Sequence, residues 1–185
     1  MIDAEGYYAF SVRQLAQRLA VTPSTVIHHV GQRVEILAAV VDAIVRESWA
    51  SDLSTAEPPP SNWPDCVRRT ADSYREVLTR HPNAAPLIID VNCHSSAQGE
   101  ASMPLLLELH AGGIPIDHLV ETHLAIVGFV TGFALQLADD GLPRNHRVLA
   151  EQLTSTSKAS RAMAVDAGFA RGIEALIAGL AASIP

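Results

Sequence analysis

An all-α fold is predicted for this chain by three features of its sequence. Apolar residues recur at helical spacing in nearly every segment, whereas alternating strand-like runs are scarce. The clearest breaks, three consecutive prolines at 58–60 and the stretch Asp139–Arg144, carry turn chemistry. The chain has 185 residues, of which 48% are hydrophobic, so it can form a small domain and one of ordinary size. We expect these at residues 1–50 and 51–185.

The helices follow from these breaks and from the capping residues. In the N-terminal part, we expect short helices at 11–19 and 23–30 and a longer one at 33–51. In the C-terminal part, helices are expected at 62–81, 83–92, 101–111, 116–138 and 164–183. The Ser/Thr-rich stretch 154–160 is predicted to be a loop.

Composition and charge exclude several classes of protein. The formal net charge of −7 argues against a protein that coats nucleic acid without specificity. Cys66 and Cys93 are isolated, which predicts free thiols and not a disulfide framework or a metal site. The purely apolar runs are short, and the N-terminus, with Asp3 and Glu5, lacks the pattern of a signal peptide. We therefore expect a cytoplasmic protein with no membrane partner.

The first two expected helices are joined by a very short turn. Ser11 is a typical N-cap, and Thr22 followed by Pro23 is a second helix start. Because only Ala20 and Val21 separate the two helices, the helices must cross at a steep angle. This is helix-turn-helix geometry, which presents the start of the second helix to a DNA major groove.

Residues 10–30 (FSVRQLAQRLAVTPSTVIHHV), followed by Arg33 and by Glu35 to Leu37, resemble the DNA-binding segment of the tetracycline-repressor (TetR) family. Residues 73–86 and 169–180 resemble the C-terminal domain of that family. The resemblance implies a transcriptional regulator, a repressor that binds a double-stranded DNA operator as a homodimer and is released by a small-molecule effector. The DNA-binding residues that it implies are Ser11, Arg13, Thr22, Ser24, Thr25, Ile27, His28, His29 and Arg33.

The N-terminal part departs from the family pattern in three ways. Only residues 1–9 precede the matching segment, which leaves room for at most the last turn of a first helix. Ile27 and Val30 stand where the family usually has large aromatic residues. Residues 1–50 contain four arginines against five acidic residues, although phosphate neutralisation supplies much of the affinity for DNA. A dimeric ligand- or protein-binding module that has lost DNA binding is therefore the alternative.

The C-terminal helices carry two further sets of candidate residues. Apolar side chains with a few polar groups suit a ligand-binding cavity; they are Tyr74, Leu78, His81, Asn92, Met103, Leu107, His110, His123, Phe129 and Phe133. Small and apolar residues at helical spacing suit close packing of two helices against a second subunit; they are Leu124, Gly128, Thr131, Leu135, Gly168, Gly172, Ala175 and Gly179.

Enzyme chemistry is not indicated by the sequence. It contains no GxSxG, Walker, dinucleotide-binding or HExxH motif, and Asp139 and Asp140 lie beside Gly141 in a predicted turn. No two histidines have the i, i+4 spacing that helical metal pairs favour. We therefore expect a regulator and not an enzyme, with neither a cofactor nor a metal.

Overall fold

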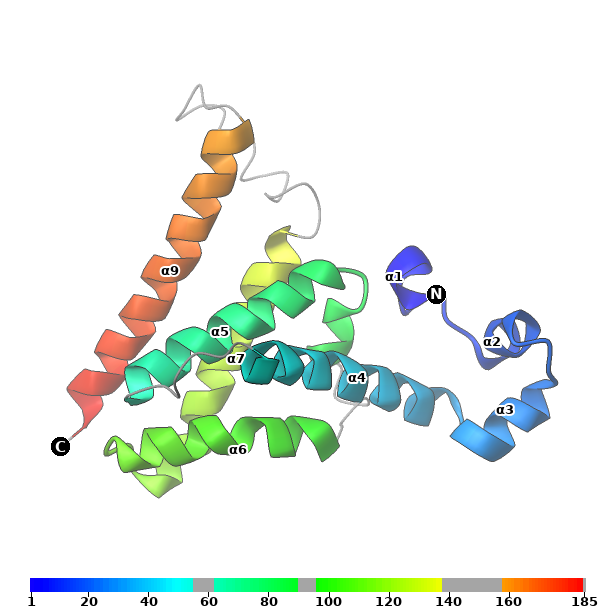
Figure 1. Cartoon of the computed structure of the whole chain (residues 1–185), viewed down its shortest axis with the longest axis horizontal. Coiled ribbons are helices and arrows are strands. Elements are labelled where there is room, and N and C mark those ends of the chain that lie inside the picture. Colours follow the sequence, from blue (N-terminus) through cyan, green and yellow to red (C-terminus); the bar gives the residue numbers. More distant parts are fainter. Residues whose placement is uncertain (55–61, 90–95, 138–157, 185) are drawn as a thin grey trace.

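The computed structural model describes residues 1–54, 62–89, 96–137 and 158–184. Every regular element within these ranges is a helix (Figure 1), so the predicted all-α class is confirmed. The elements at one end of the molecule are α1 (Ile2–Glu5), α2 (Val12–Arg18), α3 (Pro23–Val30) and the start of α4 (Arg33–Ser54). We call α1 to α3 and the first turns of α4 the head. As expected, a single helical turn, α1, precedes the helix-turn-helix.

The rest of the described chain packs at the far end of α4. It contains α5 (Trp63–Arg80), η1 (Ala85–Ile89), α6 (Ser96–Ala111), η2 (Ile116–His118), α7 (Leu119–Leu137) and α9 (Lys158–Ser183). Figure 1 shows α5 and α7 crossing in the middle of this part, with α6 and α9 on either side.

Three sequence predictions about these helices need correction. The helix expected at 83–92 is only the 3-10 helix η1 within the described residues, because Pro86 has no N–H for the ladder and its ring clashes with the preceding turn. α6 begins at Ser96 and not at 101, and it continues through Pro104. α9 begins at Lys158, so the predicted loop is helical from 158 onward. Residues 90–95 and 138–157, and with them Asn92 and the Asp139–Arg144 turn, lie outside the described residues.

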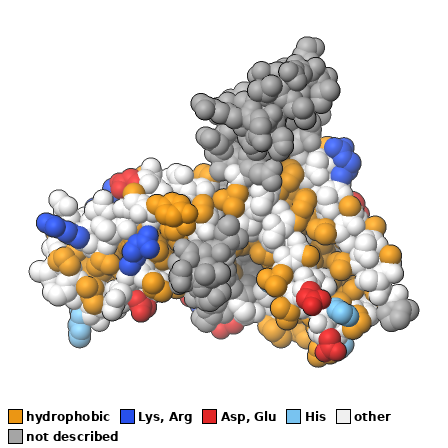
Figure 2. Space-filling view, turned by 180° about the vertical axis from the view of Figure 1, so that it is seen from behind, with side chains coloured by type: hydrophobic (Ala, Val, Ile, Leu, Met, Phe, Trp, Pro, Cys, Tyr) orange, Lys and Arg blue, Asp and Glu red, His pale blue; other side chains and the backbone are white. Residues whose placement is uncertain are grey.

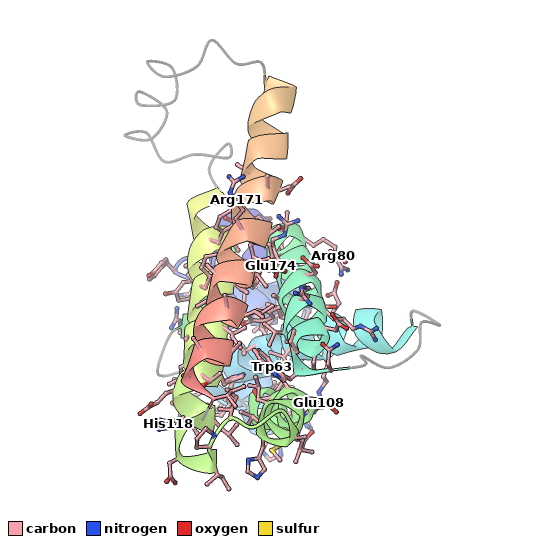
Figure 3. All side chains as sticks on the ribbon, turned by 90° about the vertical axis from the view of Figure 1, so that its left-hand side faces the viewer. Trp63, Arg80, Glu108, His118, Arg171 and Glu174 are labelled. Atoms are coloured by element: carbon pink, nitrogen blue, oxygen red, sulfur yellow. The ribbon has the colours of Figure 1, made fainter. Side chains whose placement is uncertain are left out.

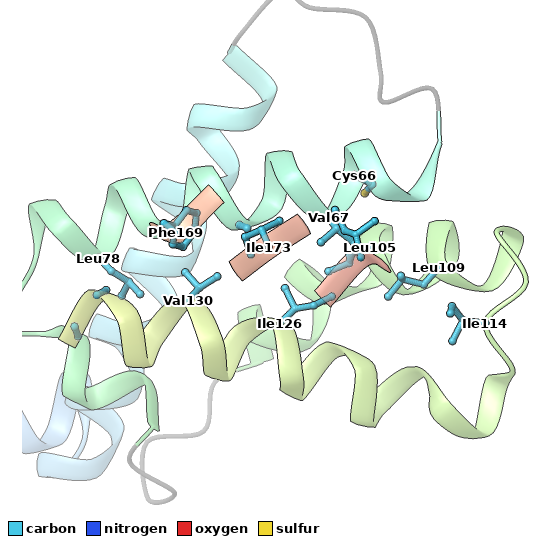
Figure 4. Packing of buried hydrophobic residues seen from close by; sticks show 14 residues of the cluster. Cys66, Val67, Leu78, Leu105, Leu109, Ile114, Ile126, Val130, Phe169 and Ile173 are labelled. Carbon is cyan, nitrogen blue, oxygen red and sulfur yellow. The ribbon is translucent and has the colours of Figure 1, made fainter. Parts of the chain in front are cut away.

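Buried hydrophobic side chains form two clusters. The first joins the head and α4 to Val77, Ala84 and Leu87. The second joins α5, α6, α7 and α9 (Figure 4). Ile88 of η1 packs against both clusters. The first core thus extends past residue 50, and the division into domains 1–50 and 51–185 stays a prediction.

The segment Ile116–Leu135 is the one stretch of the described residues that is long and apolar enough to cross a membrane. By length and composition it qualifies as a candidate span, with a mean hydropathy of 1.4, although 28% of it is buried in the protein. Its apolar residues are interrupted by single polar ones, so no long purely apolar run marks it in the sequence. One side of this stretch carries Ile126 and Val130 of the second core cluster, as a core helix of a globular domain does.

Candidate nucleic-acid interface and ligand site

Both predicted helix caps of the helix-turn-helix are present. Ser11 Oγ accepts a hydrogen bond from the backbone N–H of Gln14 at 3.2 Å. Thr22 Oγ1 accepts one from the N–H of Thr25, also at 3.2 Å, and lies 2.8 Å from the hydroxyls of Ser24 and Thr25. Three hydroxyl groups therefore cluster at the start of α3, the end that a reading helix presents to bases.

The turn between α2 and α3 is a Schellman motif with alanine in the left-handed position. Ala20 has φ 55°, its N–H donates to Gln17 O at 3.2 Å, and Val21 N–H donates to Ala16 O at 3.0 Å. These are the two hydrogen bonds that close such a motif. The motif sets the steep angle between the helices, although glycine is the residue that usually occupies this backbone region.

α3 presents a largely polar face to solvent. Val26 is its one buried residue, whereas Ser24, His28 and His29 are exposed and Ile27 is 46% exposed. The rings of His28 and His29 lie edge to face, with centroids 5.0 Å apart. Val21 and Val30 are 41% and 51% exposed, so Val26 is the valine that fills the corner between α2 and α3.

The arginines of the head differ in whether they are bound to other groups of the protein. Arg33 donates from Nη2 to Tyr7 O at 3.0 Å and from Nε to Phe10 O at 3.3 Å, and Arg18 pairs with Glu5. Arg33 thus fastens the segment before α2 to α4, although it is itself exposed, and its role as a phosphate contact stays a prediction. In the described part of the chain, Arg13 is exposed and is paired with no acidic side chain, so it is the arginine of the helix-turn-helix available to a phosphate.

Aromatic side chains of α7 and α9 meet in the second core cluster, and Arg75 of α5 lies over one of them. Phe129 and Phe133 of α7 lie 5.7 Å and 5.2 Å from Phe169 of α9, measured between ring centroids. The guanidinium carbon of Arg75 lies 4.5 Å from the Phe169 centroid, and Arg75 also pairs with Asp166 at 2.8 Å. Phe129 and Phe133 were among the predicted ligand residues, whereas Arg75 was not, because its partner Asp166 lies 91 residues away in the sequence.

Two polar groups are buried beside these rings. Burial raises the pKa of the Tyr74 phenol well above its ordinary value, and the neighbouring Thr131 hydroxyl offsets part of that shift. Thr131 is fully buried, and its Oγ1 makes no hydrogen bond of normal geometry within the described residues. An unsatisfied buried hydroxyl is costly in a folded protein, and the polar side chain beside this one is Tyr74.

The predicted ligand residues are only partly brought together. Tyr74, Leu78, Phe129 and Phe133 belong to the second core cluster. His123 is half-buried and lies 2.8 Å from Ser102 Oγ, and burial lowers its pKa. The remaining described members lie elsewhere: His81 lies beside Asp3 and Glu47, His110 is exposed, and Met103 and Leu107 are 49% and 61% exposed on α6.

The predicted interface residues also divide into two groups. Thr131 is fully buried and Leu135 packs on the core, and a Cβ on Gly172 would lie 2.2 Å from Phe129 Cζ. Thr131 and Gly172 therefore serve the packing of one subunit, which corrects their assignment to a dimer interface. The group on the outside of α7 and α9 consists of Leu124, Gly128, Ala175 and Gly179; Gly168 is half-buried, with open space where a Cβ would be.

A model of the tetracycline repressor-like C-terminal domain matches residues 55–184. The chain belongs to the TetR family. It is 25% identical over 191 residues to the class E tetracycline repressor protein of Escherichia coli, an alignment that covers 100% of this chain and 87% of that protein.

Solved structures agree with this TetR-family assignment. ActR of Streptomyces coelicolor in complex with actinorhodin has a TM-score of 0.72 and 29% identity, covering 99% of this chain and 92% of ActR. BioQ with its double-stranded DNA operator has a TM-score of 0.69 and 21% identity, covering 98% and 91% of the two chains. The predicted class is confirmed: this chain is a TetR-family transcriptional regulator and not an enzyme.

Proposed function

We propose that this chain is a repressor that binds a palindromic operator as a homodimer and is released by a small, largely apolar ligand in the cytoplasm. The observation that carries the proposal is the cluster of three hydroxyls at the start of α3, where Thr22 Oγ1 lies 2.8 Å from the hydroxyl oxygens of Ser24 and Thr25. The N-cap and the turn before it hold this end of the helix in place. Hydroxyl, imidazole and backbone N–H groups at such a helix end suit base edges and phosphates.

The homodimer is supported by the outer faces of α7 and α9. Val120 and Leu124 are 64% and 62% exposed, and Gly128 and Gly179 have open space where a Cβ would be. Figure 2 shows hydrophobic side chains spread over the face of the C-terminal part seen from this side. An exposed apolar face of this kind is typical of a subunit interface. A two-fold dimer would also place two copies of α3 on successive half-sites of a palindrome.

The ligand is proposed to contact the aromatic residues of α7 and α9. Phe129 and Phe133 offer apolar and π surface, and Tyr74 and Thr131 offer buried polar groups. A flat, mostly apolar molecule with one or two hydrogen-bonding groups matches this lining. The ligand would release DNA by favouring a dimer in which the two heads are wrongly spaced, for which a coupling of about 1–3 kcal/mol suffices.

One observation favours the alternative of a module that no longer binds DNA. In the described head, Arg18 is paired with Glu5 and Arg33 is held by backbone carbonyls, which leaves Arg13 as its available arginine. Few phosphate contacts mean that phosphate neutralisation contributes little to the affinity for DNA. The alternative predicts a folded dimer without saturable DNA binding.

Paired variants test the proposed reading face by fluorescence anisotropy with DNA from upstream of the protein's own gene. Ser24→Ala combined with His28→Ala removes two exposed polar groups from α3 and is expected to weaken operator binding at least tenfold, at about 1–3 kcal/mol for each good base contact. Leu107→Ala, on the outside of α6, is the control and should bind as the wild type does. Equal binding by all three proteins would contradict the proposed reading face.

A further inference from the structure

His81 lies where the N-terminal part of the chain meets the C-terminal helices α5 to α9, which we call the ligand domain. It is the C-cap residue of α5. Its Nδ1 lies 2.9 Å from Oδ2 of Asp3 in α1, and its Nε2 lies 3.0 Å from Oε2 of Glu47 in α4. One imidazole thus connects three helices that are far apart in the sequence.

The two carboxylates define the protonation state that this arrangement needs. A neutral imidazole has one N–H donor and one lone pair, so it can satisfy only one of two flanking carboxylates. The imidazolium has two N–H donors and can donate to both. Burial alone would lower the pKa of His81, but the bonds to Asp3 and Glu47 outweigh it and raise the pKa. Both the geometry and the raised pKa indicate that the His81 imidazole donates to both carboxylates only when it is protonated.

The other charged and polar groups at this point are arginine, carboxyl and amide side chains. Arg80 of α5 pairs with Glu47 and lies 3.7 Å from Glu76. The Asn83 side-chain amide donates to the backbone carbonyl of Asp3 at 2.6 Å. Arginine and carboxyl side chains ordinarily titrate outside the range from pH 6 to 9, whereas histidine ordinarily titrates within it. His81 is therefore the group of this network that changes charge in that range.

We propose that His81 is a proton-dependent clamp that holds α1 and α4 against the end of α5, so that the attachment of the head to the ligand domain loosens as pH rises. Below about pH 6.5, the ordinary pKa of histidine, the clamp is closed. It opens as the pH rises through the raised pKa of the folded protein. The clamp gives the head a dependence on pH that is separate from the ligand. It depends only on contacts within one subunit, so it stands even if the proposed DNA binding fails.

A metal ion does not account for the same residues. Asp3 and Glu47 lie on opposite nitrogens of the ring, so the three side chains do not converge on one point. In agreement, the described part of the chain holds no group of three or more His, Cys, Asp or Glu side chains that could bind a metal.

Hydrogen exchange of the DNA-free protein between pH 6 and 9 tests the clamp. After correction for the intrinsic pH dependence with a peptide from α9, protection of residues 1–10 is expected to fall severalfold in the wild type. His81→Gln should show the low protection at pH 6 already. Asp3→Asn, which keeps a neutral acceptor at the same place, should show much less dependence on pH. Unchanged protection of residues 1–10 in the wild type between pH 6 and 9 would overturn the proposal.

His118 provides the matched control, because its Nδ1 also faces a carboxylate, Glu121 at 3.3 Å, but within one stretch of chain. Figure 3 shows it well apart from Arg80, the neighbour of His81. His118→Gln should behave as the wild type does. A proton NMR titration, with the His81 signal assigned by its loss in His81→Gln, should give a midpoint above 6.5. A midpoint at or below that value would overturn the clamp.

Discussion

Gly172 of α9 lies directly against the ring of Phe129 of α7, so closely that a Cβ on Gly172 would stand 2.2 Å from Phe129 Cζ. This contact sets the distance between the two long helices of the ligand domain. It also places Phe129 beside Phe169, with 5.7 Å between the ring centroids. The spacing of α7 and α9, and with it the aromatic cluster, depends on the missing side chain at position 172.

Gly172→Ala is therefore expected to destabilise the protein. Overpacking costs about 1–3 kcal/mol, which exceeds the gain of up to about 1 kcal/mol from replacing a helical glycine by alanine. Gly99→Ala in α6 is the control, because nothing lies within 4 Å of its added Cβ, and it should be neutral or stabilising. Urea unfolding measures both variants. A stabilised Gly172→Ala would show that the two helices are not held this closely.

Ala20→Gly is expected to stabilise the head by roughly 1 kcal/mol. Ala20 adopts a positive φ of 55°, where glycine has no Cβ penalty. Ala39, which is exposed within α4, is the control. Ala39→Gly should lower the free energy of unfolding by about 1 kcal/mol, as replacing an ordinary helical alanine by glycine does. Thermal unfolding of the two variants distinguishes them, and a loss of stability in Ala20→Gly would mean that the turn is not left-handed.

Leu124→Glu should convert the proposed dimer into monomers. A charge placed at the centre of an apolar interface must be desolvated without a partner. Leu107→Glu is a closely matched control, because Leu107 of α6 is 61% exposed and Leu124 is 62% exposed. Sedimentation velocity should show monomers for the first variant and dimers for the second. Monomeric wild-type protein, or dimers in both variants, would rule out this interface.

The half-buried His123 is expected to make the fold acid-sensitive. Burial lowers its pKa, so its neutral form is favoured in the folded state. The stability it contributes is present above its unfolded pKa of about 6.5 and is lost as pH falls through the lower folded value. His123→Gln, which can still bond to Ser102, should therefore lose less stability than the wild type between pH 7.5 and 5.5. Denaturation curves at the two pH values test this, and equal losses would contradict it.

Structural features that depend on neighbouring residues could be predicted from the sequence. Ser11 and Thr22 could be identified as caps because their partners lie three residues along the chain. The face of a long apolar helix could not be assigned in the same way. Thr131 and Gly172 fit a small-residue interface by spacing, but they face the interior because the helix against which each packs decides which side is buried.

Long-range polar contacts were beyond the reach of sequence patterns. His81 was predicted to line a ligand cavity because it ends an amphipathic helix, yet its partners are Asp3 and Glu47, 78 and 34 residues away. Nothing in the spacing of these residues connects them. Likewise Arg33 matched a family position for DNA contact, but its guanidinium bonds to Tyr7 and Phe10 carbonyls.

A salt titration of binding between the purified chain and the DNA upstream of its own gene tests the central proposal most directly. Our account predicts saturable, sequence-dependent binding by a dimer, which weakens as salt increases, with a shallow slope because the helix-turn-helix offers few phosphate contacts. No saturable binding at low salt, from a protein confirmed as a folded dimer, would contradict the repressor and leave a ligand-binding module of TetR ancestry.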